Sequence, residues 1–245
     1  MEERLPQDIR GDRGEPLVVE RYYDYALTGR SRVVRVLGQT LRRVVALLGL
    51  SLFFSPLLVL GLVTLDLPLR MLDGLVPLEA VAPSRFLSRG EGILGAALFV
   101  ALLATRRWGS RRIGQTVLVS WLLTLAFAAM LVLDLAPELA AEDYPETRFI
   151  TSVVLSWMAG HGAGVAVFDV TRGGNWWRAP FFGGLIGLGV QALIYFPAAY
   201  VGTSQPWLWW LAVSLFLALA GAAAFTLVYA GLRFIVPPRT GLGGR

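Results

Sequence analysis

The sequence predicts an all-α polytopic membrane protein with six transmembrane helices, and three observations support this class. Of the 245 residues, 56% are hydrophobic and only 16% are charged, and the mean hydropathy is +0.61. A soluble domain of this length does not need so much apolar sequence. The apolar residues also form long continuous runs, not the alternating pattern of a barrel strand, and helices satisfy every backbone hydrogen bond inside a bilayer.

Six runs provide the predicted spans, since a bilayer core takes about 20 helical residues. They cover residues 44–65, 92–105, 113–135, 149–170, 179–201 and 207–236. The second run is short, so we expect it to begin nearer Leu87, to tilt or to pack inside the bundle. Pro56 lies near the middle of the first run, where proline kinks a helix.

The predicted organisation is a transmembrane domain at residues 44–236 between two cytoplasmic tails, 1–43 and 237–245. The first 30 residues are polar and read as poorly ordered. Residues 31–43 alternate Arg with Val and Leu, which predicts either a short basic helix on the membrane surface or the start of the first span. Residues 66–90 are too broken to span, and we expect an external loop at the interface.

The charges predict the orientation of the spans. All 22 basic residues are arginines. The arginines near residues 42–43, 106–112, 172–178 and 233–239 fall on one side of a six-span arrangement. An acidic loop (134–146) and an uncharged turn (201–206) fall on the other side. This positive-inside pattern predicts that both termini lie in the cytoplasm. We expect the protein in the bacterial inner (plasma) membrane. Topology and lipid headgroups explain the arginines, so we expect no nucleic-acid partner.

Composition excludes several kinds of chemistry. The chain has no cysteine and a single histidine, which excludes disulfides, thiolate metal sites and multi-histidine metal sites. It contains no Walker-type phosphate loop and no nucleophile–base–acid arrangement with a plausible shared site. We therefore predict that the protein is not an enzyme and has neither a cofactor nor a metal. ATP-driven transport would need a partner subunit.

Polar residues inside two predicted spans suggest a ligand site. His161 lies deep in the fourth span and Gln191 deep in the fifth, and an unpartnered polar group in hydrocarbon is costly. Trp157 and Tyr195 lie four residues from them, on the same helical faces. If the two spans face each other, the four side chains line one aromatic, hydrogen-bonding cavity without fixed charge, which suits a flat, neutral heterocycle. The alternative is that His161 and Gln191 only join neighbouring helices.

Glycines at helical spacing predict close packing of the fourth and fifth spans. Gly160 and Gly164 lie on one span, and Gly183 and Gly187 on the other. Small residues allow two helix backbones to approach closely in a membrane. The same glycines would also leave room for a ligand, and the two interpretations are compatible.

Two segments resemble the vitamin uptake transporter-like family, known for queuosine precursor transporters. Residues 165–172 (VAVFDVTR) followed by 176–180 (WWRAP) are similar to its junction between the fourth and fifth spans, and residues 104–109 (ATRRWG) to its loop between the second and third. The resemblance covers roughly residues 90–200. It implies six spans, cytoplasmic termini and a 7-deazaguanine substrate such as preQ0 or preQ1.

The chain departs from the family pattern at the acidic positions. In the fourth span, His161 and Gly164 stand where the family has Gln and Asp. In the fifth span, Gln191 and Ala192 stand where it has Asp and Thr. Near the end of the second span, where the family has an acidic residue, residues 102–104 are apolar. We therefore predict a transporter that imports a small neutral heterocyclic nutrient, with a queuosine precursor as one candidate. The alternative is a non-transporting structural or assembly subunit of a membrane complex. Whether the chain forms a homo-oligomer or binds a partner subunit stays open.

Overall fold

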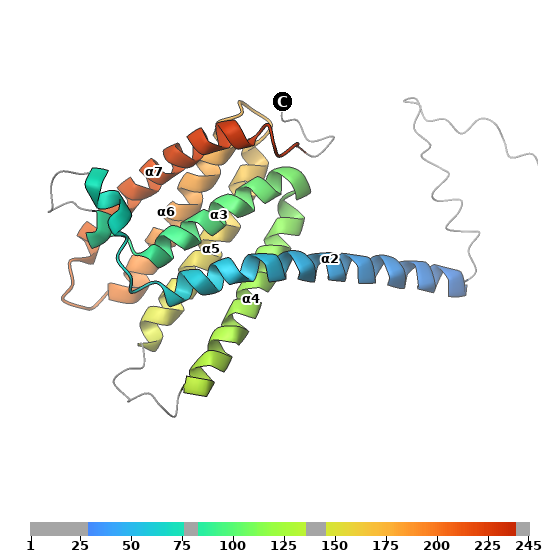
Figure 1. Ribbon diagram of the computed structural model, residues 1–245, viewed down its shortest axis with the longest axis horizontal. Coiled ribbons are helices and arrows are strands. Elements are labelled where there is room, and N and C mark those ends of the chain that lie inside the picture. Colours follow the sequence, from blue (N-terminus) through green and yellow to red (C-terminus); the bar gives the residue numbers. More distant parts are fainter. Residues whose placement is uncertain (1–28, 76–82, 136–145, 239–245) are drawn as a thin grey trace, which may run out of the picture. The chain divides into compact units, whose positions relative to one another are not determined.

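The computed structural model describes residues 29–75, 83–135 and 146–238, which contain six α-helices and no β-strand. The predicted all-α class is confirmed for this part of the chain. The helices, labelled in Figure 1, are α2 (Gly29–Val63), α3 (Arg89–Trp108), α4 (Ser110–Leu135), α5 (Thr147–Thr171), α6 (Arg178–Tyr200) and α7 (Trp207–Leu232). Two short 3₁₀ helices, η1 (Arg70–Leu75) and η3 (Pro83–Arg85), lie between α2 and α3.

Five of these helices, α2 and α4 to α7, are long and apolar enough to cross a membrane. This places the protein in a membrane. The helix α3 has 20 residues but carries Arg89 and Glu91 in its first turn and Arg106 and Arg107 in its last. The count of six spans therefore stays a prediction, and it depends on α3.

The structure describes only part of the two predicted tails. Residues 1–28, 76–82, 136–145 and 239–245 lie outside the described residues, and they include most of the two predicted tails and of the acidic loop. The chain divides into two units, residues 1–46 and 47–245. Residues 31–43 belong to the same continuous helix as the first predicted span, which runs from Gly29 through Pro56 to Val63.

Local signals set the ends of α3. Ser88 precedes it as the N-cap, and with Glu91 it forms a capping box in which each side chain accepts a hydrogen bond from the other residue's backbone N–H. Gly109 ends the helix at a φ of +83°, which a side chain would disfavour. Its N–H donates to the carbonyl of Thr105, and α4 starts one residue later.

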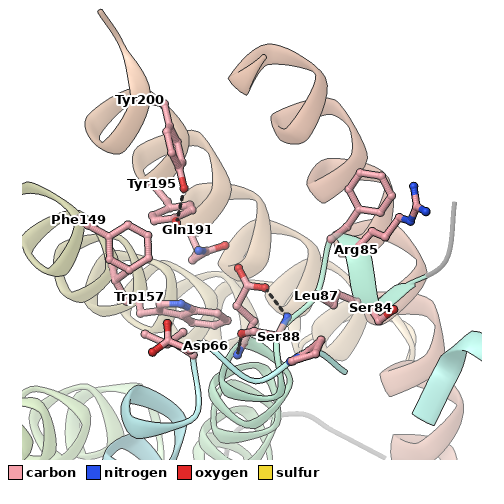
Figure 2. Close-up of a pocket in the computed structure, with 15 residues that line it drawn as sticks. Asp66, Ser84, Arg85, Leu87, Ser88, Phe149, Trp157, Gln191, Tyr195 and Tyr200 are labelled. Atoms are coloured by element: carbon pink, nitrogen blue, oxygen red, sulfur yellow. Dashed lines mark hydrogen bonds between the residues drawn. The ribbon is translucent and has the colours of Figure 1, made fainter. Parts of the chain in front are cut away.

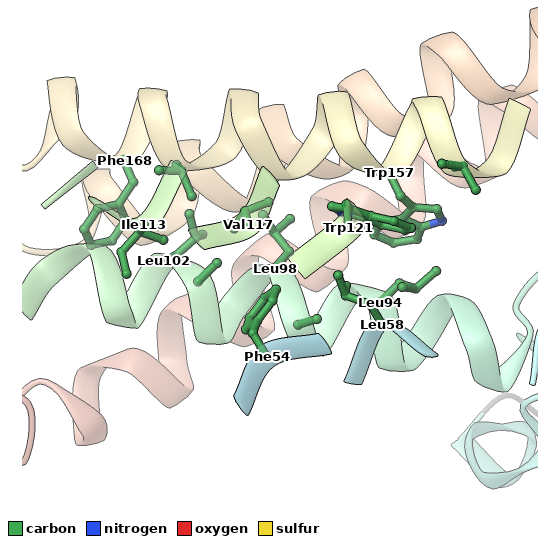
Figure 3. Packing of buried hydrophobic residues seen from close by; sticks show 14 of the residues in the cluster. Phe54, Leu58, Leu94, Leu98, Leu102, Ile113, Val117, Trp121, Trp157 and Phe168 are labelled. Carbon is green, nitrogen blue, oxygen red and sulfur yellow. The ribbon is translucent and has the colours of Figure 1, made fainter. Parts of the chain in front are cut away.

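The bundle within residues 47–245 is organised around α5 and α6, which make the most extensive helix contact. The next helix, α7, packs on α6, while α3 packs on α4, α5 and α6. Leu94, Leu98 and Leu102 repeat every fourth residue on α3 and are 0% exposed. Figure 3 shows these leucines among core side chains that include Trp121 of α4 and Phe168 of α5.

Small polar side chains connect α2 to α4. Ser51 Oγ donates to the Thr116 carbonyl at 3.3 Å, and Ser120 Oγ donates to the Ser51 carbonyl at 3.2 Å. One turn further, Thr124 Oγ1 donates to the Ser55 carbonyl at 3.4 Å. Such residues join helices in lipid, where apolar surface alone gives little preference for a helix neighbour over a lipid tail.

Candidate functional site

A cavity of about 290 Å³ lies at the end of the bundle where α3 and α5 begin and α6 ends. Its walls come from the α2–α3 connection, the first turn of α3, the N-terminal half of α5 and the C-terminal half of α6. Figure 2 shows aromatic side chains from α5 and α6 on one side of this cavity and residues of the connection on the other. We call it the α5–α6 pocket.

Backbone hydrogen bonds attach the connection to the start of α3. The Leu69 N–H donates to the Leu87 carbonyl at 3.0 Å, and the Arg89 N–H donates to the Leu67 carbonyl at 2.6 Å. The segments on both sides of residues 76–82 are thus paired with each other. One wall of the pocket is therefore a paired backbone segment instead of a helix face.

Asp73 attaches a second part of the same wall. The Ser84 N–H donates to Asp73 Oδ1 at 2.9 Å, and the hydrogen bonds from Ser84 hold the pKa of the Asp73 carboxyl below its ordinary value. Ser84 and Arg85 line the pocket. The ionised form of Asp73 therefore holds this part of the wall in place.

The structure brings three of the four predicted binding residues together. Trp157, Gln191 and Tyr195 all line the pocket, and each is buried. The Tyr195 hydroxyl lies 3.3 Å from that of Tyr200, and the Tyr195 ring meets the Phe149 ring edge-on at 5.9 Å. The pocket thus combines aromatic faces with one amide that both donates and accepts hydrogen bonds.

His161 is the residue that the structure keeps out of the pocket. It is 0% exposed, and its Nδ1 lies 2.7 Å from the Trp157 carbonyl one turn earlier in α5. Three aromatic rings surround it, with centroids 5.7 Å away for Trp157, 6.0 Å for Trp121 and 6.3 Å for Phe54. His161 therefore lies behind Trp157, towards the middle of the bundle.

Charged side chains also line the pocket, namely Asp66, Arg85 and Glu91. The expected cavity without fixed charge is therefore not what the structure has. The sequence does carry a signal for Glu91, because Ser88-x-x-Glu91 matches the capping-box pattern. Glu91 Oε2 accepts the Ser88 N–H at 3.0 Å, which fixes the carboxylate at the wall.

The four predicted packing glycines lie at the contact between α5 and α6. A Cβ built on Gly160 would come within 2.6 Å of the Gly187 carbonyl oxygen, and one on Gly164 within 2.9 Å of the Gly183 carbonyl oxygen. Only glycine allows the backbones to be this close. This close approach sets the position of Gln191 on α6 relative to Trp157 on α5.

Polar contacts at the opposite end of the bundle hold helix ends together. Arg106 donates to the Tyr229 hydroxyl at 2.8 Å, which connects α3 to α7. Ser110 Oγ donates to Asp169 Oδ2, and Arg172 pairs with Asp169 at 2.6 Å. We interpret these contacts as structural, because the first two join the end of one helix to a neighbour and the third lies within the C-terminal end of α5.

Within the described ranges, no group of three or more His, Asp or Glu side chains is placed to hold a metal ion. Comparison of the chain with models of known protein families, with curated proteins and with solved structures gives no match.

Proposed function

We propose that this membrane protein is a transporter that imports a small planar heterocycle, which it binds in the α5–α6 pocket. The observation that carries the proposal is the meeting of Trp157, Gln191 and Tyr195 around one cavity. The two rings offer surfaces for stacking, and the amide offers one donor and one acceptor for a polar ring edge. A volume of about 290 Å³ suits a one- or two-ring compound.

The position of the pocket supports import over export. It lies at the end of α3 that carries the capping box, while Arg106 and Arg107 mark the other end. By the positive-inside pattern, the arginine-rich end faces the cytoplasm. We therefore extend the proposal to a bacterial inner membrane protein with cytoplasmic termini, whose pocket faces the exterior.

Glu91 broadens the range of ligands to be tested. Its carboxyl group adds a hydrogen-bond acceptor to the wall that can pair with an N–H group of a ligand. The sequence resemblance suggests 7-deazaguanines as candidates, and with an acid in the wall the amine-bearing preQ1 joins the neutral preQ0. We propose no catalytic step for this pocket.

Ligand binding is tested first on the purified protein in detergent. Thermal unfolding is recorded against deazapurines, purines, pyrimidines and vitamins, because a ligand that binds only the folded state stabilises it by about 2.7 kcal/mol at a hundredfold excess over Kd. We expect stabilisation by at least one compound, lost in Trp157→Ala and Gln191→Ala. The matched controls are Trp209→Ala and Gln205→Ala, both at exposed positions.

Uptake of that compound into proteoliposomes then tests transport. Accumulation that Gln191→Ala abolishes supports the proposal. If no compound stabilises the folded protein and a partner protein co-purifies with it, the transporter proposal is wrong and the structural-subunit alternative takes its place.

A further inference from the structure

Two buried polar atoms near the middle of the bundle have no hydrogen-bond partner among the described residues. They are Nε1 of Trp121 on α4 and Nε2 of His161 on α5, although the backbone of Leu94 on α3 also interacts with the His161 ring. Both side chains are 0% exposed, and their ring centroids lie 6.0 Å apart at an angle of 73°. A buried polar group without a partner costs about 1–3 kcal/mol. Two of them in adjacent rings call for one explanation.

The hydrogen bond at Nδ1 of His161 determines whether Nε2 of the same ring donates or accepts. His161 Nδ1 lies 2.7 Å from the Trp157 carbonyl, and a carbonyl only accepts, so Nδ1 carries the proton. Nε2 of the neutral ring is then an acceptor. The indole Nε1–H of Trp121 is a donor only. The two rings therefore offer one acceptor and one donor close together.

Trp157 separates these two atoms from the pocket. Its side chain lines the pocket on one side, and its ring centroid lies 5.7 Å from that of His161 on the other. Figure 3 shows Trp157 and Trp121 in the same part of the core, on helices α5 and α4. The His161 ring thus contacts a wall residue of the pocket, and the Trp121 ring contacts His161 in turn.

We infer that Trp121 and His161 form an inner binding site for the transported ligand, reached when Trp157 moves aside. The complementary ligand group is a lactam edge, in which an N–H donates to His161 Nε2 and the neighbouring C=O accepts from Trp121 Nε1. Gln191 in the pocket also offers one donor and one acceptor, so both sites suit the same edge. This inference rests on the proposed function, and it adds a ligand class and a route towards the middle of the bundle.

The test separates binding in the pocket from passage through the inner site. Guanine and uracil have a lactam edge, and adenine has none. Binding is measured by thermal stabilisation, and passage by uptake of radiolabelled guanine and uracil into proteoliposomes. Trp121→Phe removes the donor and keeps a ring, His161→Leu removes the acceptor, and His161→Gln keeps an amide acceptor. Trp209→Phe, on an exposed position of α7, is the matched control.

We expect Trp121→Phe and His161→Leu to reduce guanine uptake at least tenfold and to weaken guanine binding less than Trp157→Ala and Gln191→Ala do. His161→Gln should recover part of the uptake, and Trp209→Phe should leave it unchanged. Unchanged uptake in both inner-site variants, or equal loss in His161→Gln and His161→Leu, refutes the inner site alone. Absence of stabilisation by guanine or uracil in the wild type overturns the lactam assignment for both sites.

A second measurement covers the case in which a variant does not fold. The wild-type protein contains eight tryptophans, whose indole N–H signals are resolved by selective ¹⁵N labelling. Saturating guanine should shift two buried indole signals, those of Trp157 and Trp121, and adenine at most one. A shift of only one signal with guanine contradicts the inner site.

Discussion

Replacement of Gly160 by alanine tests the contact between α5 and α6. The new Cβ would lie 2.6 Å from the Gly187 carbonyl oxygen and 3.0 Å from the Gln191 Cβ. Ordinary contacts begin at 3.4 Å, so the backbones must separate by roughly 0.8 Å. Such overpacking costs about 1–3 kcal/mol, and alanine recovers about 1 kcal/mol of helix propensity. We expect a net loss of up to about 2 kcal/mol in the free energy of unfolding.

The assay is equilibrium unfolding in mixed micelles, with Gly162→Ala and Gly189→Ala as controls. A Cβ at either control position meets nothing within 4 Å, so these variants should be as stable as the wild type or more stable by up to about 1 kcal/mol. Because the new methyl group also presses on Gln191, Gly160→Ala should weaken ligand binding in the pocket. Stability equal to that of the controls would refute the close approach of the two backbones.

Three further predictions concern contacts around the helix ends. Arg148→Ala removes two hydrogen bonds to carbonyls at the end of α6. Because Arg148 is exposed, we expect a loss of only about 1 kcal/mol in the free energy of unfolding. A larger loss in Arg148→Ala than in Arg148→Lys would show that the guanidinium makes both hydrogen bonds at once. Ser110→Ala removes the donor to Asp169 and should cost about 1–2 kcal/mol in the same assay; no change would mean that this bond does not stabilise the packing of α4 on α5. Hydrogen bonds from Ser84 lower the pKa of Asp73, so the contribution of Asp73 to the free energy of unfolding is present above the ordinary carboxyl pKa and is lost as pH falls through the lower folded value. Asp73→Asn should abolish that part of the acid dependence of the free energy of unfolding, and an unchanged pH profile of unfolding would count against it.

The helical period accounts for what the sequence predicts correctly about the site. Trp157 and Gln191 lie on the faces of α5 and α6 that contain the packing glycines, and residues four apart on a helix share a face. From this alone the sequence predicts that Trp157, Gln191 and Tyr195 approach one another. The all-α class follows in the same way, from long apolar runs that need internal hydrogen bonding in lipid.

The period cannot show how deep a residue lies or which third helix covers it. His161 is one turn further from the pocket than Trp157, and α4 covers it with Trp121. The pocket wall from the α2–α3 connection also lies beyond sequence prediction, because its pairing depends on tertiary hydrogen bonds such as that of Leu69 with Leu87. Glu91 enters the pocket through a capping box, a local pattern that predicts a helix start and not a ligand.

The glycine contact also limits which parts of the protein can move in the proposed transport function. Sliding α5 along α6 would carry bulkier side chains into spaces that only hydrogen atoms fill at Gly160 and Gly164. The two helices therefore behave as one rigid body, a fixed frame for the other elements. Under the proposed transport function, an alternating-access cycle would consist of rearrangements of α3, α4 and the α2–α3 connection against that frame. Substitutions that alter the transport rate without altering equilibrium binding should accordingly map outside the α5–α6 pair.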